Sequence, residues 1–304
     1  MNVKAYIISY FGNRDKPEER QVRVENHKQQ IDFWKAYCPE MQIQVLAQDY
    51  NEDEFIEGIE YVVHRGDLLT PAQARNVLLE NFYSDVDFGN NHEWALFMDN
   101  DAVLKAHDEF YFTRMNICKV LENFPNNFEG VDLFFPHWDG RPGDGAFKDK
   151  YKNLDKNYIN VKWDRELCFD RKFGSMKGTM FFLRRNEQRV KFNEKFTYID
   201  GNLLVGEDDF FALECAMKGL KTYILRNILL KEYTSPSTHA GAQNTRKAEM
   251  DKGDKIFRDT YGLPESRGQW YKYVGRRYGI YIDKRIVRPY LEEIRTNTLE
   301  ELFT

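Results

Sequence analysis

The chain has 304 residues, of which 42% are hydrophobic and 31% are charged, so it is long and apolar enough to bury a full globular core. Its formal net charge of −5 argues against a protein built wholly around a polyanion, but leaves room for local basic patches. The four cysteines are widely spaced and form no C-x-x-C pair, which favours reduced thiols over a zinc site or a disulfide framework.

Targeting and membrane signals are not visible in the sequence. The first residues lead directly into a strand-like run, without the apolar core and cleavage site of a signal peptide. No stretch approaches the ~18 consecutive apolar residues that a membrane span requires. We therefore expect a cytoplasmic protein that does not engage a membrane.

The first hundred residues alternate between strand-like and helix-like segments. Apolar runs at 5–11, 41–47 and 60–64 predict strands, and the apolar spacing over 18–37 predicts a helix. Thr70 as N-cap, Pro71 in the first turn and Gln73 completing a capping box predict a second helix, which ends near Phe82. A continuous apolar run at 94–98 predicts a buried fourth strand. This order predicts an α/β sheet with helices packed on it.

The second half of the chain is less regular. We expect a helix over 108–124, a strand over 131–136, a long loop over 137–156 and a strand over 178–183. A helix over 207–217 should end at Gly219, a good residue to follow a helix, and two short strands should cover 222–225 and 229–233. The remainder is helical and basic. We therefore divide the chain into a domain at 1–240 and an extension at 241–304 that packs on it.

Two carboxylates end the fourth strand, at Asp99 and Asp101. Side chains two residues apart on a strand point to the same side, so both could face one cation. Oxygen ligands of this kind suit Mg²⁺ or Mn²⁺, which commonly share a site with substrate phosphates. The alternative is a strand followed by a polar turn, because Asp and Asn are common turn formers.

Three further motifs carry candidate chemistry. Glu207 and Asp208 open a helix, where they either complement its dipole or present a base that takes a proton from an acceptor hydroxyl. His239 is either a surface residue or a ligand that completes the cation's shell. Arg75 is either an exposed helix residue or a partner for phosphate or for a catalytic loop.

The order of these motifs resembles that of the GT-A glycosyltransferases. The matching segments are 72–76 (AQARN), 99–101 (DND), 178–185 (GTMFFLRR), 206–209 (GEDD) and His239. The β-1,4-galactosyltransferases have a similar G-E-D-D run with a downstream His, and here 31 residues separate Asp208 from His239. The resemblance covers about residues 3–240.

The resemblance implies a GT-A, Rossmann-like mixed sheet with flanking helices, and metal-dependent transfer of a sugar from a UDP-sugar to an acceptor hydroxyl. Asp99, Asp101 and His239 would hold Mn²⁺ or Mg²⁺. Asp208 would be the general base of an inverting transfer, with Glu207 helping to hold the acceptor. The residues expected to contact the donor are Ser9, Tyr10, Arg65, Arg75 and Asp99.

A basic and aromatic segment at 267–288 bears on the acceptor. It holds seven basic residues, five aromatic residues and a single acidic one. Cations interleaved with rings suit phosphates and unstacked bases, although the segment could equally be a cap with rings on the core and solvated cations. The residues expected to contact nucleic acid are Arg267, Trp270, Lys272, Arg276, Arg277 and Arg285.

The composition also resembles that of T4-like bacteriophage proteins. With the basic segment, this resemblance implies an enzyme that glycosylates hydroxymethylated cytosine in double-stranded DNA, in the host cytoplasm if phage-encoded. The target base would be flipped out of the duplex, or its hydroxymethyl group reached in the major groove.

Three alternatives stay open. The acceptor could be a saccharide of a bacterial surface polymer. The enzyme could be a nucleotide-sugar hydrolase or pyrophosphorylase, although residues 11–14 (FGNR) are a poor version of the glycine-rich loop that a pyrophosphorylase uses. The chain could also be a nucleic-acid-binding module with a non-catalytic GT-A-like domain, against which the presence of Asp99, Asp101, Asp208 and His239 argues.

Overall fold

The structure is a computed structural model, and it describes residues 3–85, 92–106, 132–138, 169–171, 178–196, 198–199, 202–203, 206–233 and 246–266. Within these ranges nine strands form one sheet, in the order β3-β2-β1-β4-β8-β6-β11-β5, with β7 paired to β11. The strands of this sheet are β1 (Val3–Tyr10), β2 (Gln42–Gln48), β3 (Glu60–His64), β4 (Trp94–Asp99), β5 (Ala102–Ala106), β6 (Leu133–Trp138), β7 (Phe169–Arg171), β8 (Met180–Arg184) and β11 (Thr222–Glu232).

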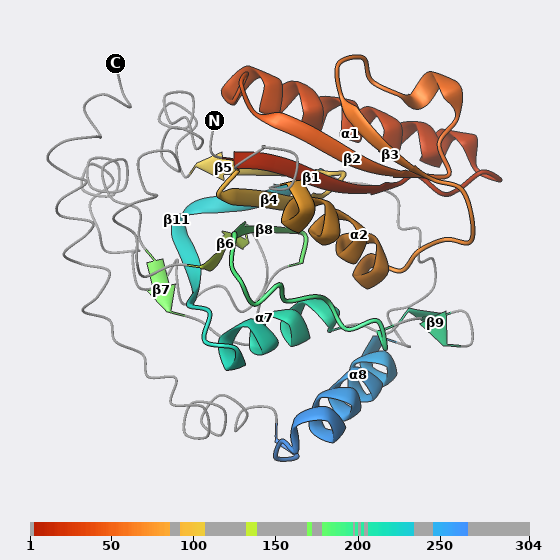
Figure 1. Cartoon of the computed structure of the whole chain (residues 1–304). Coiled ribbons are helices and arrows are strands. Elements are labelled where there is room, and N and C mark those ends of the chain that lie inside the picture. Colours follow the sequence, from red (N-terminus) through yellow and green to blue (C-terminus); the bar gives the residue numbers. More distant parts are fainter. Residues whose placement is uncertain are drawn as a thin grey trace, which may run out of the picture.

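The sheet is mixed and helices flank it, which confirms the predicted α/β fold (Figure 1). Strands β3, β2, β1 and β4 run parallel, whereas β8 is antiparallel to both β4 and β6. The main helices are α1 (Pro17–Tyr37), α2 (Pro71–Ser84), α7 (Glu207–Met217) and α8 (Arg246–Tyr261). Small elements are the 3₁₀ turn η1 (Glu52–Glu54) and the pair β9 (Tyr198–Ile199) and β10 (Asn202–Leu203).

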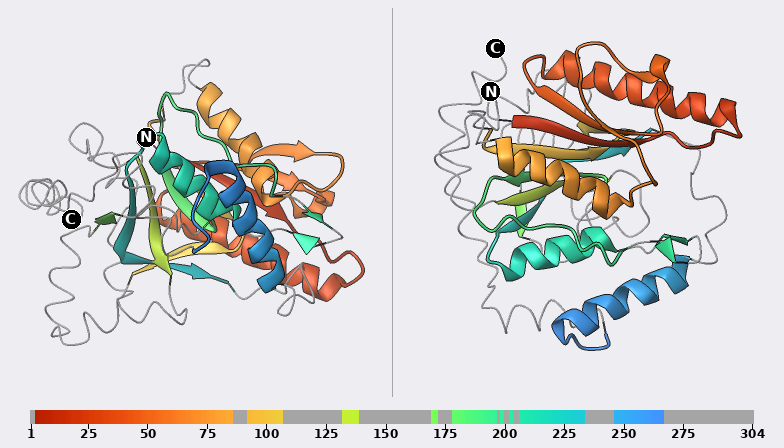
Figure 2. Two further views of the ribbon diagram at one scale, coloured as in Figure 1. Left: turned by 90° about the horizontal axis from the view of Figure 1, so that it is seen from below. Right: turned by 45° about the vertical axis from the view of Figure 1, so that its right-hand side comes forward.

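The helices form layers on the two faces of the sheet. Helix α1 covers one face, and α2 and α7 cover the other, with α8 outside α7 (Figures 1 and 2). A single apolar cluster joins α2, α7 and the sheet face beneath them; among its members are Leu78, Phe97, Phe181 and Phe211. Because alternate side chains of a strand point to opposite faces, the neighbouring residues of these strands supply the core under α1.

Helix α2 begins as the sequence predicts. The Thr70 Oγ1 accepts a hydrogen bond from the Gln73 backbone N–H at 3.3 Å, and the Gln73 side chain accepts one from the Thr70 N–H at 3.0 Å. This capping box satisfies two backbone donors that a helix start otherwise leaves unpaired. It also fixes the rotation of α2 one turn before Arg75.

Helix α8 packs on α7 through aromatic residues. The Phe257 ring lies 4.6 Å from that of Phe210 and 6.0 Å from that of Phe196, and all three side chains are buried. Gly206, which precedes α7, has φ +112°, a conformation that side chains of L-residues rarely adopt. The C-terminal segment, predicted to be helical, forms the helix Arg246–Tyr261 within the described residues. The domain boundary at 240/241 stays a prediction.

Two strand predictions need correction. The residues expected to form two strands at 222–225 and 229–233 form one strand, β11, whose register against β6 shifts between Leu225 and Leu229. An irregularity of this kind bends a strand without ending it. Strand β5 was not predicted, because it follows the polar turn at Asn100 and, among the described residues, pairs with the distant β11.

Several predictions fall on residues beyond the described ranges. These are the helix at 108–124, most of the loop at 137–156, His239 and the basic segment at 267–288. Over the residues that are described, no helix combines the length and apolarity needed to cross a membrane.

Candidate functional site

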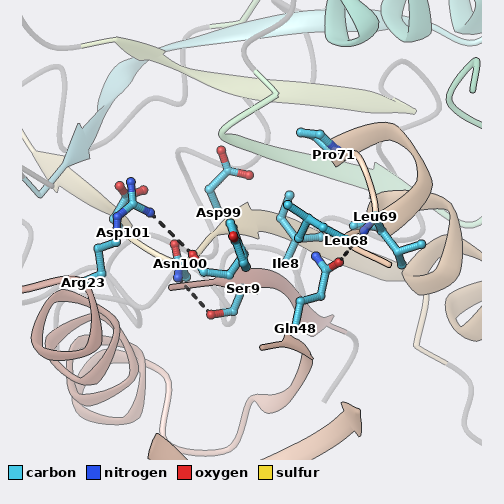
Figure 3. A pocket seen from close by; sticks show the side chains of 12 residues that line it. Ile8, Ser9, Arg23, Gln48, Leu68, Leu69, Pro71, Asp99, Asn100 and Asp101 are labelled. Carbon is cyan, nitrogen blue, oxygen red and sulfur yellow. Dashed lines mark hydrogen bonds between the residues drawn. The ribbon is translucent and has the colours of Figure 1, made fainter. Parts of the chain in front are cut away.

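A pocket of about 170 Å³ opens at the carboxyl ends of β1, β2 and β4 (Figure 3). The chain runs from β1 outward to β2 and β3 and then returns to β4 on the other side of β1, so the strand order reverses here. Open α/β sheets bind ligands at such a reversal. The residues that line the pocket are Ile8, Ser9, Tyr10, Arg23, Gln48, Leu68, Leu69, Pro71, Ala74, Asp99, Asn100 and Asp101.

Asp99 and Asp101 both line this pocket, but not by the geometry that the sequence suggested. Strand β4 ends at Asp99, and Asn100 and Asp101 form a turn before β5. Alternation along a strand therefore does not bring the two carboxylates together. Both line the pocket from this turn, with the Asp101 side chain beside Arg23 and the Asp99 side chain directed away from Arg23 (Figure 3).

Gln30 on α1 holds both ends of this turn. Its side-chain Nε2 donates to the backbone carbonyl oxygen of Asp99 at 2.6 Å and to that of Ala102 at 2.7 Å. The Oε1 of Gln30 lies 3.2 Å from Nδ1 of the buried His27, so Nδ1 carries the proton that it donates to Oε1. Burial lowers the pKa of His27 to about 4, which keeps the imidazole neutral at physiological pH.

Further backbone and side-chain contacts complete the support of the turn. The Asp99 N–H donates to the Thr179 carbonyl at 2.9 Å, and the Tyr233 N–H donates to the Asp101 carbonyl at 2.8 Å. The Asn100 side chain donates to Ser9 Oγ at 2.9 Å, and this oxygen also accepts from the Tyr50 hydroxyl at 2.5 Å. The turn is thus fixed from four separate segments of the chain.

Arg75 joins the pocket to the start of α7. Its guanidinium is buried and donates to Asp99 Oδ1 at 3.0 Å and to Glu207 Oε1 at 3.0 Å. Its Cζ lies 5.3 Å from the centre of the Phe192 ring, which adds a cation–π contact. A planar guanidinium suits this role because its N–H donors are arranged as a fork.

Asp208 ties α7 to the segment before β8. Its Oδ2 accepts from the Gly178 N–H at 3.0 Å and its Oδ1 from the Asp209 N–H at 2.8 Å. A Cβ atom on Gly178 would lie 2.9 Å from the Asp208 Cβ and 3.1 Å from the Arg75 Nη2. Residue 178 therefore has to be glycine for Arg75 and Asp208 to approach each other this closely.

The two carboxylates bound to Arg75 have perturbed acidities. Burial raises the pKa of Asp99, and the negative charge of Asp208 raises it further, while Arg75 lowers it. Burial and the neighbouring Asp208 likewise raise the pKa of Glu207 against the opposing effect of Arg75. Clusters in which burial and a specific charge partner compete are frequent at functional sites.

The turn carries two carboxylates, the type of ligand that a hard divalent cation prefers. The Arg75 contact to Asp99 Oδ1 leaves the second oxygen of that carboxylate, and Asp101 adds another carboxylate at the same pocket. In the described ranges, no three His, Cys, Asp or Glu side chains gather into a metal cluster. A cation held here would therefore need ligands from a substrate phosphate, from water or from His239.

Only some of the other residues predicted to contact the sugar donor lie in the pocket. Ser9 and Tyr10 line the pocket, whereas Arg65 is exposed and is not among the lining residues. Arg75 reaches the pocket only through Asp99. The predicted ligand His239 and the predicted nucleic-acid contacts Arg267, Trp270, Lys272, Arg276, Arg277 and Arg285 lie where the structure gives no description.

Sequence reasoning missed the apolar lining of the pocket and, among the polar residues of the site, Arg23, Gln30 and Gln48. The first two lie on α1, where polar residues in a helix pattern give no sign of which ones are buried. Gln48 ends β2, is 4% exposed and accepts a hydrogen bond from the Leu69 N–H at 2.9 Å. Its place directly after an apolar strand was the only local signal.

No protein-family model matches the chain, and no curated protein matches its sequence. Solved structures with a similar fold include glucosyl-3-phosphoglycerate synthase from Mycobacterium tuberculosis in complex with Mn²⁺, UDP and glucosyl-3-phosphoglycerate. The two chains share 11% identity over 87% of this chain and 81% of that chain, with a TM-score of 0.43.

GalNAc-T7 with UDP, GalNAc and Mn²⁺ shares 10% identity over 97% of this chain and 57% of that chain, with a TM-score of 0.45. CMP:2-keto-3-deoxy-manno-octonic acid synthetase complexed with CTP shares 10% identity over 86% of this chain and 100% of that chain, with a TM-score of 0.37. At this level of similarity, the function has to be argued from the site residues themselves.

The contacts of Gln30 predict a specific loss of stability. Gln30→Leu removes the donor of the buried Ala102 carbonyl and of the partly buried Asp99 carbonyl, and an orphaned buried acceptor costs about 1–3 kcal/mol of unfolding free energy. Urea denaturation of Gln30→Leu and of the control Gln29→Leu, whose side chain is exposed on the same helix, measures the difference. Equal stability of the two variants would contradict the assigned role.

Arg75→Met should lower the unfolding free energy by about 1–3 kcal/mol near neutral pH, because it leaves two partly buried carboxylates without their cation. The loss should narrow as the pH falls from about 7.5 to about 5, because removal of the Arg75 charge raises the pKa of Asp99 and Glu207 further, and uptake of protons relieves their uncompensated negative charge.

Denaturation curves at both pH values, with Arg14→Met as control, measure this effect. The Arg14 side chain is 57% exposed in its pair with Asp49, so its removal should cost little at either pH. A loss for Arg75→Met that is independent of pH would show that the two carboxylates are not the source of the effect.

Proposed function

We propose that the chain is a metal-dependent glycosyltransferase that moves a sugar from a UDP-sugar to an acceptor hydroxyl. The observation that carries this proposal is the Arg75 bridge, which joins a carboxylate of the pocket, Asp99, to the acidic start of α7. A transferase needs a site for the leaving diphosphate next to a group that accepts the acceptor's proton. Arg75 supports this proposal because it links the pocket at Asp99 to the carboxylates at the start of α7.

The proposed reaction is an inverting displacement. The bond from the anomeric carbon of the sugar to the diphosphate oxygen breaks, and its electron pair leaves with the diphosphate. The acceptor oxygen forms the new bond to the same carbon, and its proton passes to the Asp208 carboxylate. Asp208 can take this proton because each of its oxygens is engaged by one backbone N–H and keeps another lone pair.

The chain's own residues would organise the two substrates. Gln30 and Ser9 hold the turn that carries Asp99 and Asp101, so the backbone that bears these carboxylates is already fixed before the donor binds. Glu207, held by Arg75 beside Asp208, would help to position the acceptor. Asp99 and Asp101, with His239, would hold Mn²⁺ or Mg²⁺, which when bound stabilises the negative charge of the departing diphosphate.

For the acceptor, we propose hydroxymethylated cytosine in double-stranded DNA. The support is the sequence of the basic and aromatic segment at 267–288 and the compositional resemblance to phage proteins. A pyrimidine hydroxymethyl group offers the primary alcohol that the proposed base would deprotonate.

The donor reaction is tested with a panel of radiolabelled UDP-sugars and Mn²⁺ or Mg²⁺. We expect turnover of one donor by the wild-type chain and loss of metal-dependent turnover in Asp101→Ala. Asp208→Asn should keep donor binding but lose about 10²–10⁴-fold in the rate of transfer. The control Asp32→Asn, exposed on α1, should behave as wild type.

Full activity of Asp208→Asn would exclude Asp208 as the general base. Full activity of Asp101→Ala would contradict the proposal that Asp101 binds a catalytic metal ion. No turnover of any donor would favour a nucleic-acid-binding module with a non-catalytic domain.

The acceptor is tested by offering labelled donor to duplex DNA with and without 5-hydroxymethylcytosine. We expect label only in the hydroxymethylated duplex. Replacement of Arg276, Arg277 and Arg285 by Gln should weaken DNA binding and lower the slope of log affinity against log salt by about 2–3. Donor hydrolysis without labelled DNA would move the acceptor to a saccharide, and unaltered DNA affinity would make the segment structural.

A further inference from the structure

The pocket is chemically polarised along its length. Leu68, Leu69 and Pro71 lie at one end, and Arg23 and Asp101 lie at the other, with Ser9 between them (Figure 3). A nucleoside diphosphate has the same polarity, with a flat, largely apolar base at one end and charged phosphates at the other. A ligand of this kind would match the pocket in one orientation, with its phosphates toward Arg23.

Arg23 is the single cationic side chain among the residues that line the pocket. It comes from α1 and reaches the end of β1, where its Nη1 donates to the Tyr10 carbonyl oxygen at 3.5 Å. The side chain is partly buried; burial lowers the pKa of its guanidinium, and the negative charge of Asp101 raises it. A guanidinium stays charged under these conditions.

A partly desolvated guanidinium at this position has a clear chemical use. It offers several N–H donors in one plane, which matches the oxygens of a phosphate. Two carboxylates, Asp99 and Asp101, stand at the same pocket, so a bound diphosphate without a local cation would be repelled. Arg23 supplies positive charge from the chain itself at the pocket, whereas Arg75 does not line the pocket and is paired with Asp99 and Glu207.

We propose that Arg23 is a phosphate-binding residue of this pocket, which contacts the diphosphate of the donor nucleotide and fixes its orientation. The inference rests on the proposed function, because it takes a nucleoside diphosphate as the ligand. Arg23 would thus add a contact to the sugar-donor nucleotide that comes neither from the turn at Asp99 and Asp101 nor from Arg75. Arg23 contacts the phosphates, and the apolar end of the pocket contacts the nucleoside.

The test is calorimetric titration of UDP and of uridine, in the presence of Mg²⁺, into the wild-type chain and three variants. Arg23→Gln should weaken UDP binding by about 10-fold or more and leave uridine binding unchanged, because only UDP carries the charged groups. Arg23→Lys should recover part of the UDP affinity. Lys35→Gln, exposed on the same helix, should bind both ligands as wild type does.

The outcomes separate this inference from the proposed function. Unchanged UDP affinity in Arg23→Gln, or an equal loss for UDP and uridine, would overturn the phosphate-binding role while wild-type sugar transfer still stood. A wild-type chain that binds neither UDP nor uridine would overturn both. Thermal unfolding at the same midpoint as wild type would show that the loss in Arg23→Gln is local to the site.

Discussion

The buried guanidinium of Arg75 is the interaction on which the site depends. It holds Asp99 at the end of β4 and Glu207 at the start of α7. Among the described residues, no other ion pair links these two elements. Removing one member of a buried ion pair is costly because the other charge stays buried and uncompensated. The close approach also requires glycine at position 178, where any Cβ would meet both Asp208 and Arg75. The geometry of both halves of the site thus rests on one side chain.

The two halves have different chemistry. The pocket at the reversal of strand order is built on rigid parallel strands, and its carboxylate turn is held through Gln30, Ser9 and backbone contacts. The start of α7 presents Glu207 and Asp208 at a helix N-terminus, where negative charge is favourable. Support of this kind is what a preorganised site requires, because groups that are already fixed need no reorganisation during the reaction. The arrangement agrees with a donor site joined to a site of proton removal.

Local patterns in the sequence predicted local structure well. The capping box at Thr70 and Gln73, the apolar strand before Asp99 and the helix at Glu207–Met217 all depend on residues a few positions apart. Glu207, one of the two partners of Arg75, lies 132 residues away, and the carbonyls held by Gln30 lie about 70 residues away, so no pattern of neighbouring residues predicts either contact. The same limit explains the error at β11, where pairing with β6 and β5 carries the strand across an irregularity. Asp99 and Asp101 line one pocket, but they do so from a turn and not by strand alternation, and their grouping around one cation stays a prediction.

The central claim is that the pocket between β1, β2 and β4 binds the nucleoside diphosphate of a sugar donor with its phosphates at the carboxylate turn. A crystal structure of the chain with UDP and Mn²⁺ tests it most directly. The account predicts the uracil at the end formed by Leu68, Leu69 and Pro71, and the diphosphate between Asp101 and Arg23. A nucleotide bound elsewhere on the chain, or bound here in the reverse orientation, would contradict it.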